Sequence, residues 1–212
     1  MFYFLAFQAA TATKTTVFTA SCPSGQTLLS CGLDNSQKDK AEWYRSSIPI
    51  NSTTCECYDF FGVTCVAWCT NVPINNIEII KTSGSGNFTA SCPTGKKVLG
   101  CHIDPTATQV EDWREFYPSA DGTACNCYDY FGADCVASCA SDINNYEVVS
   151  VWGTSLVTVG CSKPNNQVLG CGSNPDGANG LEKWRTTRAQ SGSCVCFDFF
   201  GTRCYAICGQ VW

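Results

Sequence analysis

The sequence contains a single histidine, few basic residues and no long apolar run. Nucleophilic triads usually use histidine as the base, and structural zinc sites usually show C-x₂₋₄-C pairs, often with histidine, so this chain fits neither kind of site. With 13 basic residues against 18 acidic ones, the net charge is −5 and there is no basic patch, which argues against nucleic-acid binding. No stretch approaches the roughly 18 apolar residues of a membrane helix, so we expect no transmembrane helix.

Cysteine, in contrast, is abundant, and its spacing repeats three times. The 18 cysteines form three sets of six, spaced 9, 24, 2, 8 and 4 residues apart in the first two sets and 10, 23, 2, 8 and 4 in the third. This density is typical of oxidising compartments, and the C-x-C and C-x₃-C pairs favour disulfides over zinc. We therefore expect three tandem cysteine-rich modules, at residues 1–71, 72–142 and 143–212. A module of about 70 residues buries only a small core, so covalent staples are expected.

Short apolar and alternating runs between turn residues predict an all-β fold. Each repeat opens on such a run, TTVFTASC, SGNFTASC or TSLVTVGC, and contains a block of the form C-x-C-[YF]-D-[FY]-F-G-x-x-C. The aspartates of this block are Asp59, Asp129 and Asp198. We expect each to cap the backbone N–H groups of a turn rather than to act in catalysis or to bind Ca²⁺.

The two ends of the chain break the repeat. Apolar runs at 77–80 and 148–151 follow the first two modules, whereas no such run follows the third. We predict that the N-terminal residues 1–10, with the apolar run 2–7, supply the missing strand of the third module and close a ring, which removes an exposed sheet edge. A short signal peptide is the alternative, because the apolar run precedes an Ala-Thr-Ala sequence, although no basic residue comes before Lys14.

Each repeat also contains a tryptophan upstream of its C-x-C pair, namely Trp43, Trp113 or Trp184. A residue that recurs beside the cysteines is typical of core packing over a disulfide, and we prefer this role to sugar stacking or partner binding. The loops that follow differ between repeats, and loops on rigid scaffolds commonly carry recognition. Their apolar residues are candidate tips for a partner pocket or a bilayer. These candidates are Ile48, Ile50, Phe116 and Tyr117.

The chain also contains one histidine and two N-glycosylation sequons. His102 stands where the other two repeats have glycine, and we expect it on the surface or in a loop. The sequence 51–53 is an N-glycosylation sequon in a polar loop, which makes Asn51 a candidate acceptor. A second sequon, at 87–89, falls in a predicted strand, and we expect it to remain unused.

The C-P-x-G opening, the recurring tryptophan, the C-x-C pair and the closing G-x-x-C resemble the resistin-type cysteine-rich module, from residue 16 onward. Three modules in tandem resemble the cysteine-rich C-terminal domain of the proprotein convertase that binds the LDL receptor. They also resemble the C-terminal β domain of apicomplexan perforin-like proteins. The resemblance implies three small β-sandwich modules around a pseudo-threefold axis.

The resemblance also implies a disulfide pairing, which the spacing alone leaves open because six cysteines allow 15 pairings. The implied pairs are Cys22–Cys65, Cys31–Cys55, Cys57–Cys69, Cys92–Cys135, Cys101–Cys125, Cys127–Cys139, Cys161–Cys204, Cys171–Cys194 and Cys196–Cys208.

These observations favour a non-enzymatic module that docks onto other proteins of a larger assembly or stabilises it. We expect no cofactor and no metal, and an oxidising compartment outside the cytoplasm: a secreted protein, a secretory organelle or an organellar lumen. The alternative, implied by the perforin-like resemblance, is a membrane-targeting domain. A lectin or an enzyme has no positive support in the sequence.

Overall fold

The computed structural model describes residues 7–34, 45–105, 114–175 and 186–211. All regular structure in these ranges is β-strand, which confirms the all-β prediction. No helix among the described residues is long and apolar enough to cross a membrane.

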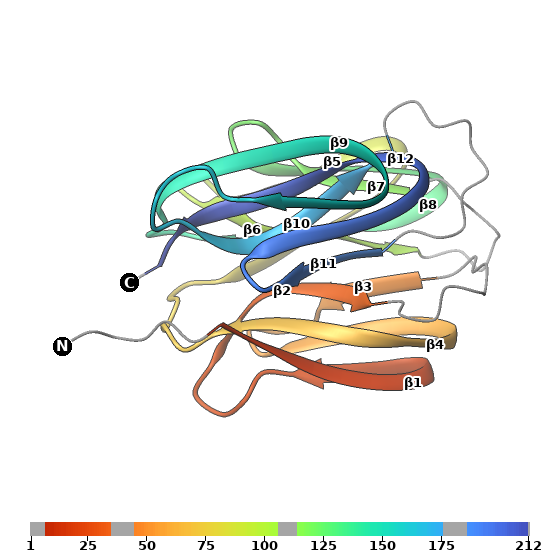
Figure 1. The fold of residues 1–212 in the computed structure, drawn as a ribbon, viewed down its shortest axis with the longest axis horizontal. Helices are drawn as coiled ribbons and strands as arrows, with labels where there is room; N and C mark the ends of the chain where they lie inside the picture. The colour runs from red at the N-terminus through yellow and green to blue at the C-terminus, as the bar shows by residue number, and fades with distance from the viewer. Residues whose placement is uncertain (1–6, 35–44, 106–113, 176–185, 212) are drawn as a thin grey trace.

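Within the described residues, each cysteine repeat contributes four strands (Figure 1). In each repeat the fourth strand pairs antiparallel with the other three. The first repeat contains β1 (Phe7–Ser21), β2 (Thr27–Asp34), β3 (Arg45–Pro49) and β4 (Thr54–Thr70). The second contains β5 (Glu78–Ser91), β6 (Lys97–Pro105), β7 (Arg114–Pro118) and β8 (Ala124–Ala140). The third contains β9 (Asn144–Gly160), β10 (Gln167–Asn174), β11 (Thr186–Gln190) and β12 (Ser193–Gln210).

The long fourth strand of each repeat folds back on itself. In β4, residues 55–59 pair with β3 and residues 64–70 pair with β2, while β1 pairs with both halves. Eight residues of straight strand span about 26 Å. The Cα atoms of Cys57 and Cys65 nevertheless lie 5.8 Å apart, so the strand bends sharply between them. We call residues 59–63, 129–133 and 198–202 the bends, because the strand register shifts at each of them.

The bends decide the disulfide pairing. The expected pairs Cys31–Cys55, Cys101–Cys125 and Cys171–Cys194 are present. The other six expected pairs are replaced by Cys22–Cys69, Cys57–Cys65, Cys92–Cys139, Cys127–Cys135, Cys161–Cys208 and Cys196–Cys204.

The geometry of β4 explains this correction. Cys57 and Cys65 each lie two residues from the ends of the bend, so they face each other across the fold. Cys22 lies beyond the last residue of β1, at the end of the repeat away from the bend, where β4 also ends. Cys65 lies about 13 Å further along β4 than Cys69, too far from Cys22 for the Cα separation of a disulfide.

The predicted closing strand is also corrected. The apolar runs at 77–80 and 148–151 lead into or lie within β5 and β9, the first strands of the second and third repeats. Their counterpart in the first repeat is β1, in which Phe7 pairs with Thr70 of β4. The three first strands have 15, 14 and 17 residues, so no repeat lacks this strand. Residues 1–6 of the predicted segment lie outside the described residues.

The core is built from the disulfides and the aliphatic residues around them. One buried cluster lies within the first repeat, around Phe18, Leu28 and Leu33. A larger one joins the second and third repeats and includes Leu29 and Trp68 from the first. The indole nitrogen of Trp68 donates to the backbone carbonyl of Val168 at 2.9 Å, which ties the first repeat to the third.

Strands of different repeats also meet directly. β7 pairs with β10, while β3 lies against β6 and β11 against β2. Figure 1 shows β11 beside β2, where the third repeat covers the first. In each contact the third strand of one repeat meets the second strand of another.

Candidate interaction surface

The apolar residues predicted as tips do not form an exposed tip. Ile50 is 47% exposed, in the turn after β3, but Ile48 is only 7% exposed. Phe116 lies in β7 and pairs with β10, and the ring of Tyr117 stacks on that of Tyr205 with centroids 5.2 Å apart. The prediction is wrong for Ile48, Phe116 and Tyr117, because the segments that contain them form strands that pack against a neighbouring repeat, whereas Ile50 is exposed as expected.

The bends, in contrast, present aromatic side chains to solvent. In the second repeat the carboxylate of Asp129 is buried, and its Oδ1 accepts hydrogen bonds from the backbone N–H of Phe131 at 3.0 Å and of Gly132 at 2.9 Å. Its Oδ2 accepts from Nε of Arg114 at 2.9 Å. Gly132 has a φ of 115°, in the region that favours glycine. The expected turn-capping role of Asp129 is therefore confirmed.

The capped turn projects two rings. Tyr130 is 66% exposed and Phe131 is 44% exposed. Their rings meet edge to face with centroids 5.1 Å apart. These two rings form an apolar projection on a turn whose aspartate accepts three hydrogen bonds.

The third repeat has a similar bend. The buried Asp198 accepts from the backbone N–H of Gly201 at 3.2 Å, so it too caps its turn. Trp152 and Leu156, on β9, flank this bend and are 53% and 64% exposed. A Cβ on Gly201 would lie 3.0 Å from the Trp152 ring, which places the indole against the bend. The side chain of Asp59, in the first repeat, lies outside the described residues.

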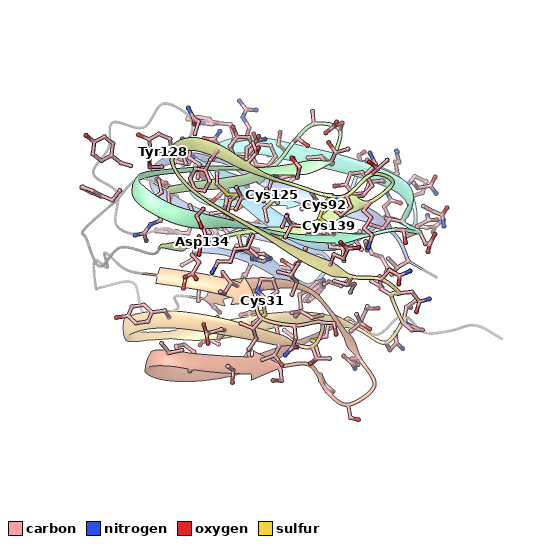
Figure 2. All side chains as sticks on the ribbon, turned by 180° about the vertical axis from the view of Figure 1, so that it is seen from behind. Cys31, Cys92, Cys125, Tyr128, Asp134 and Cys139 are labelled. Atoms are coloured by element: carbon pink, nitrogen blue, oxygen red, sulfur yellow. A yellow bond between two sulfur atoms is a disulfide. The ribbon has the colours of Figure 1, made fainter. Side chains whose placement is uncertain are left out.

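All three bends lie at the same end of the molecule, away from the C-terminus (Figure 1). We call this the bend end. Figure 2 shows Tyr128 and Asp134 toward this end, and the disulfide between Cys92 and Cys139 toward the other. The bends of the second and third repeats, with their exposed aromatic residues, therefore lie at one end of the molecule.

Two carboxylates of the described residues near the bend end, those of Asp129 and Asp134, form ion pairs. Lys81 lies 2.6 Å from Asp134 and 3.5 Å from Asp104. Burial pushes the pKa of Asp134 upward, but hydrogen bonds from Lys81 and Ser83 outweigh this and hold the pKa below its usual value. The hydrogen bond to Asp134 in turn raises the pKa of Lys81. Together with the ion pair of Asp129, this places hydrogen-bonded, ion-paired carboxylates on the same strands as the bend of the second repeat.

The sequence contained a signal for this surface that we interpreted only as a turn. Two aromatic residues lie between each bend aspartate and its glycine. A capped four-residue turn has no interior for these side chains, so they must point outward or onto a neighbour. Tyr130 and Phe131 point outward.

One group of residues has the proximity expected of metal ligands. Glu147 lies near the sulfur atoms of Cys161 and Cys208. These cysteines form a disulfide with each other, so they are not thiolate ligands. Burial pushes the pKa of the Glu147 carboxyl upward, but hydrogen bonds from Ser162, Lys163 and Asn166 outweigh this and hold the pKa below its usual value. The carboxylate thereby closes the turn before β10. This group is structural.

The remaining predicted residues have different outcomes. His102 is buried at 1% exposure, against the expectation of a surface or loop residue. Asn51 is exposed in the turn between β3 and β4. The recurring tryptophans, Trp43, Trp113 and Trp184, lie outside the described residues.

No protein-family model matches this chain. No curated protein matches it either.

Proposed function

We propose that the chain is a non-enzymatic binding module of an oxidising, extracytoplasmic space, and that its bend end docks onto a protein partner. The observation that carries this proposal is the exposed pair Tyr130 and Phe131 on a turn that the buried Asp129 holds in place. The nine disulfides support the compartment, because such density is rare in reducing surroundings.

Protein docking fits the chemistry of the bend end. The cores of protein interfaces are enriched in aromatic residues and depleted in unpaired charges. The described part of this surface carries Tyr130, Phe131, Trp152 and Leu156 beside paired carboxylates. Rings held by a capped turn also lose little conformational entropy when they bind, which favours affinity.

The platform behind this surface consists, in our proposal, of three β-sandwich modules around a pseudo-threefold axis. The support comes from the strand contacts: β3 meets β6, β7 meets β10, and β11 meets β2. These contacts run from the first repeat to the second, from the second to the third, and from the third back to the first. The position of the three bends at one end in Figure 1 is what such a closed arrangement would produce, and it supports the proposal.

Paired variants test the docking proposal. We expect a Tyr130→Ser, Phe131→Ser double variant of the full chain to lose the partners that the wild type recovers from its native source. Ile50→Ser is the matched control, because Ile50 is also exposed but lies in the turn opposite the bend. Equal recovery by all three proteins would contradict the proposal. Equal loss in the double variant and in Ile50→Ser would place the binding surface elsewhere.

Membrane targeting is the second candidate. Exposed tyrosine, tryptophan, phenylalanine and leucine side chains at one end are suited to the interface of a bilayer. Flotation with neutral phosphatidylcholine vesicles separates the two functions. Binding by the wild type that is lost in Trp152→Ser, Leu156→Ser would favour the membrane, whereas no binding would favour a protein partner.

A further inference from the structure

Two repeats share the same side-chain turn at the hairpin before the fourth strand. In the first repeat, Oδ1 of Asn51 accepts hydrogen bonds from the backbone N–H of Thr53 at 2.8 Å and from its hydroxyl at 2.9 Å. In the second, Oδ1 of Asp121 accepts from the backbone N–H of Thr123 at 3.1 Å and from its hydroxyl at 2.9 Å. The positions correspond, because Cys22 and Cys92 donate to the carbonyls of these two threonines, each at 2.8 Å.

The comparison separates what the turn needs from what Asn51 adds. An oxygen acceptor is enough to close the turn, since Asp121 closes it without an amide. Hydrogen bonds from Ser119 and Thr123 lower the pKa of Asp121 to about 2, so it serves as a carboxylate. Both bonds of Asn51 likewise end on its oxygen, and the turn makes no use of the amide nitrogen Nδ2. Asn51 is exposed, so this nitrogen is accessible.

We propose that Asn51 is the acceptor of an N-linked oligosaccharide. Asn51-Ser52-Thr53 is a sequon, and the turn already holds the threonine hydroxyl on the side-chain oxygen of the asparagine. In the transfer, Nδ2 forms a bond to C1 of a sugar carried on a polyisoprenyl diphosphate. The bond between C1 and the diphosphate oxygen breaks, the diphosphate leaves with the electron pair, and the amide gives up one proton.

The second sequon provides an internal contrast. Asn87 lies within β5 and pairs with Tyr128, and Thr89 pairs with Asn126, so the segment is extended. Phenylalanine and threonine favour this extended form, whereas an asparagine turn forms locally between residues two apart. We therefore expect Asn87 to remain unmodified.

The position of Asn51 suits the proposed docking surface. Residues 54–59 of β4 run from the Asn51 turn to the bend of the first repeat, roughly 17 Å away. An oligosaccharide on Asn51 therefore leaves the bend end open. This inference rests on the extracytoplasmic part of the proposed function, but its readout is covalent and independent of any binding partner.

The test uses the full chain secreted from cultured eukaryotic cells behind a cleavable leader. Peptide-N-glycosidase F converts an occupied asparagine to aspartate, and peptide mapping locates the change. We expect occupancy at Asn51 and none at Asn87. A wild type that is secreted with its disulfides formed but with Asn51 bare would overturn the proposal.

Exchange between the two turns makes the test specific. Asn51→Asp copies the turn of the second repeat, so we expect it to lose the oligosaccharide and to keep the wild-type melting temperature. Thr53→Ala removes the sequon by a second route and retains the backbone hydrogen bond. Asp121→Asn creates a sequon with Thr123, and we expect it to gain an oligosaccharide. Occupancy at residue 121 in this variant, with Asn51 still bare, would show that the host cell glycosylates this protein at an equivalent turn. That result would refute the proposal directly.

Discussion

Two contacts between repeats are made by equivalent strands, but the space between the two strands is filled differently. Where β10 meets β7, the strands approach so closely at Gly172 that a Cβ there would lie 2.8 Å from the carbonyl oxygen of Phe116. Where β6 meets β3, the equivalent position is His102, whose ring is buried and hydrogen-bonds to the backbone of Ser47. One contact is closed by two backbones, and the other holds an imidazole between them.

The difference has an electrostatic consequence. Nε2 of His102 is buried and has no hydrogen-bond partner in the described structure. Burial outweighs the hydrogen bond to Ser47 and lowers the pKa of His102 to about 3. The ring is therefore neutral in the folded protein at pH values where a free histidine is charged. The contact with Gly172 contains no such group, so only one of the two contacts depends on pH in this way.

The largest expected effect is acid destabilisation through His102. The unfolded chain binds a proton below about pH 6.5, whereas the folded chain does so only near pH 3, so stability is lost as the pH falls between these values. The expected slope is about 1.4 kcal/mol per pH unit, which amounts to several kcal/mol over the window. Chemical denaturation of the oxidised protein from pH 7 to pH 3 measures it.

The variant His102→Gly isolates this contribution from that of the carboxylates. It makes the contact resemble the other two. The slope of stability against pH gives the number of protons taken up on unfolding, and between pH 6 and pH 4 we expect this number to be smaller in the variant than in the wild type by nearly one. Identical slopes in the two proteins would mean that the imidazole is not held neutral.

A smaller effect is expected from filling the other contact. Gly172→Val places side-chain atoms where the structure has the Phe116 carbonyl and the Tyr117 Cα, at 2.8 and 2.9 Å from the new Cβ. Backbone atoms in paired strands shift less readily than side chains, so we expect a loss of about 3 kcal/mol in the free energy of unfolding. Gly160→Ala is the control, because its nearest neighbour would lie 3.7 Å away. Equal stability of the two variants would show that the strands at Gly172 are free to separate.

The first and third repeats are joined by a hydrogen bond from an indole nitrogen to a backbone carbonyl. Trp68 donates to the carbonyl of Val168, and the corresponding residues in the other repeats, Ser138 and Ile207, have no indole. Trp68→Phe keeps a large ring and removes the donor, so we expect a loss of about 1–2 kcal/mol. The midpoint of denaturation at pH 7 measures this loss, and an unchanged midpoint would mean that water replaces the donor.

These contacts also show where sequence reasoning succeeds and fails. Capping by Asp129 was predictable, because an aspartate, two residues and a glycine define a turn from local chemistry alone. The pairing of Cys57 with Cys65 was not, because it depends on a bend that an alternating pattern does not reveal. The burial of His102 was not predictable either, because the residue that its ring contacts, Ser47, is far away in sequence. The sequence identifies local turns and strand faces, whereas the packing of one repeat on another needs the structure.

The smallest expected effect concerns Ser30, which stands where the other repeats have Gly100 and Gly170. Its hydroxyl and Nε2 of His102 lie 3.0 and 2.8 Å from the position that a Cβ on Gly100 would occupy, so the two groups are neighbours. The hydroxyl nevertheless donates to the Cys31 carbonyl at 3.4 Å.

A double-mutant cycle of Ser30→Gly and His102→Gly measures any direct interaction between the two groups. Because Nε2 accepts no hydrogen bond from the hydroxyl, we expect a coupling energy below about 0.5 kcal/mol at pH 7. A coupling of about 1 kcal/mol would show that the hydroxyl turns toward the ring in solution. The imidazole would then be partnered, and this hydrogen bond would favour the neutral ring in addition to burial, so the pH dependence of the contact between β6 and β3 would not come from burial alone.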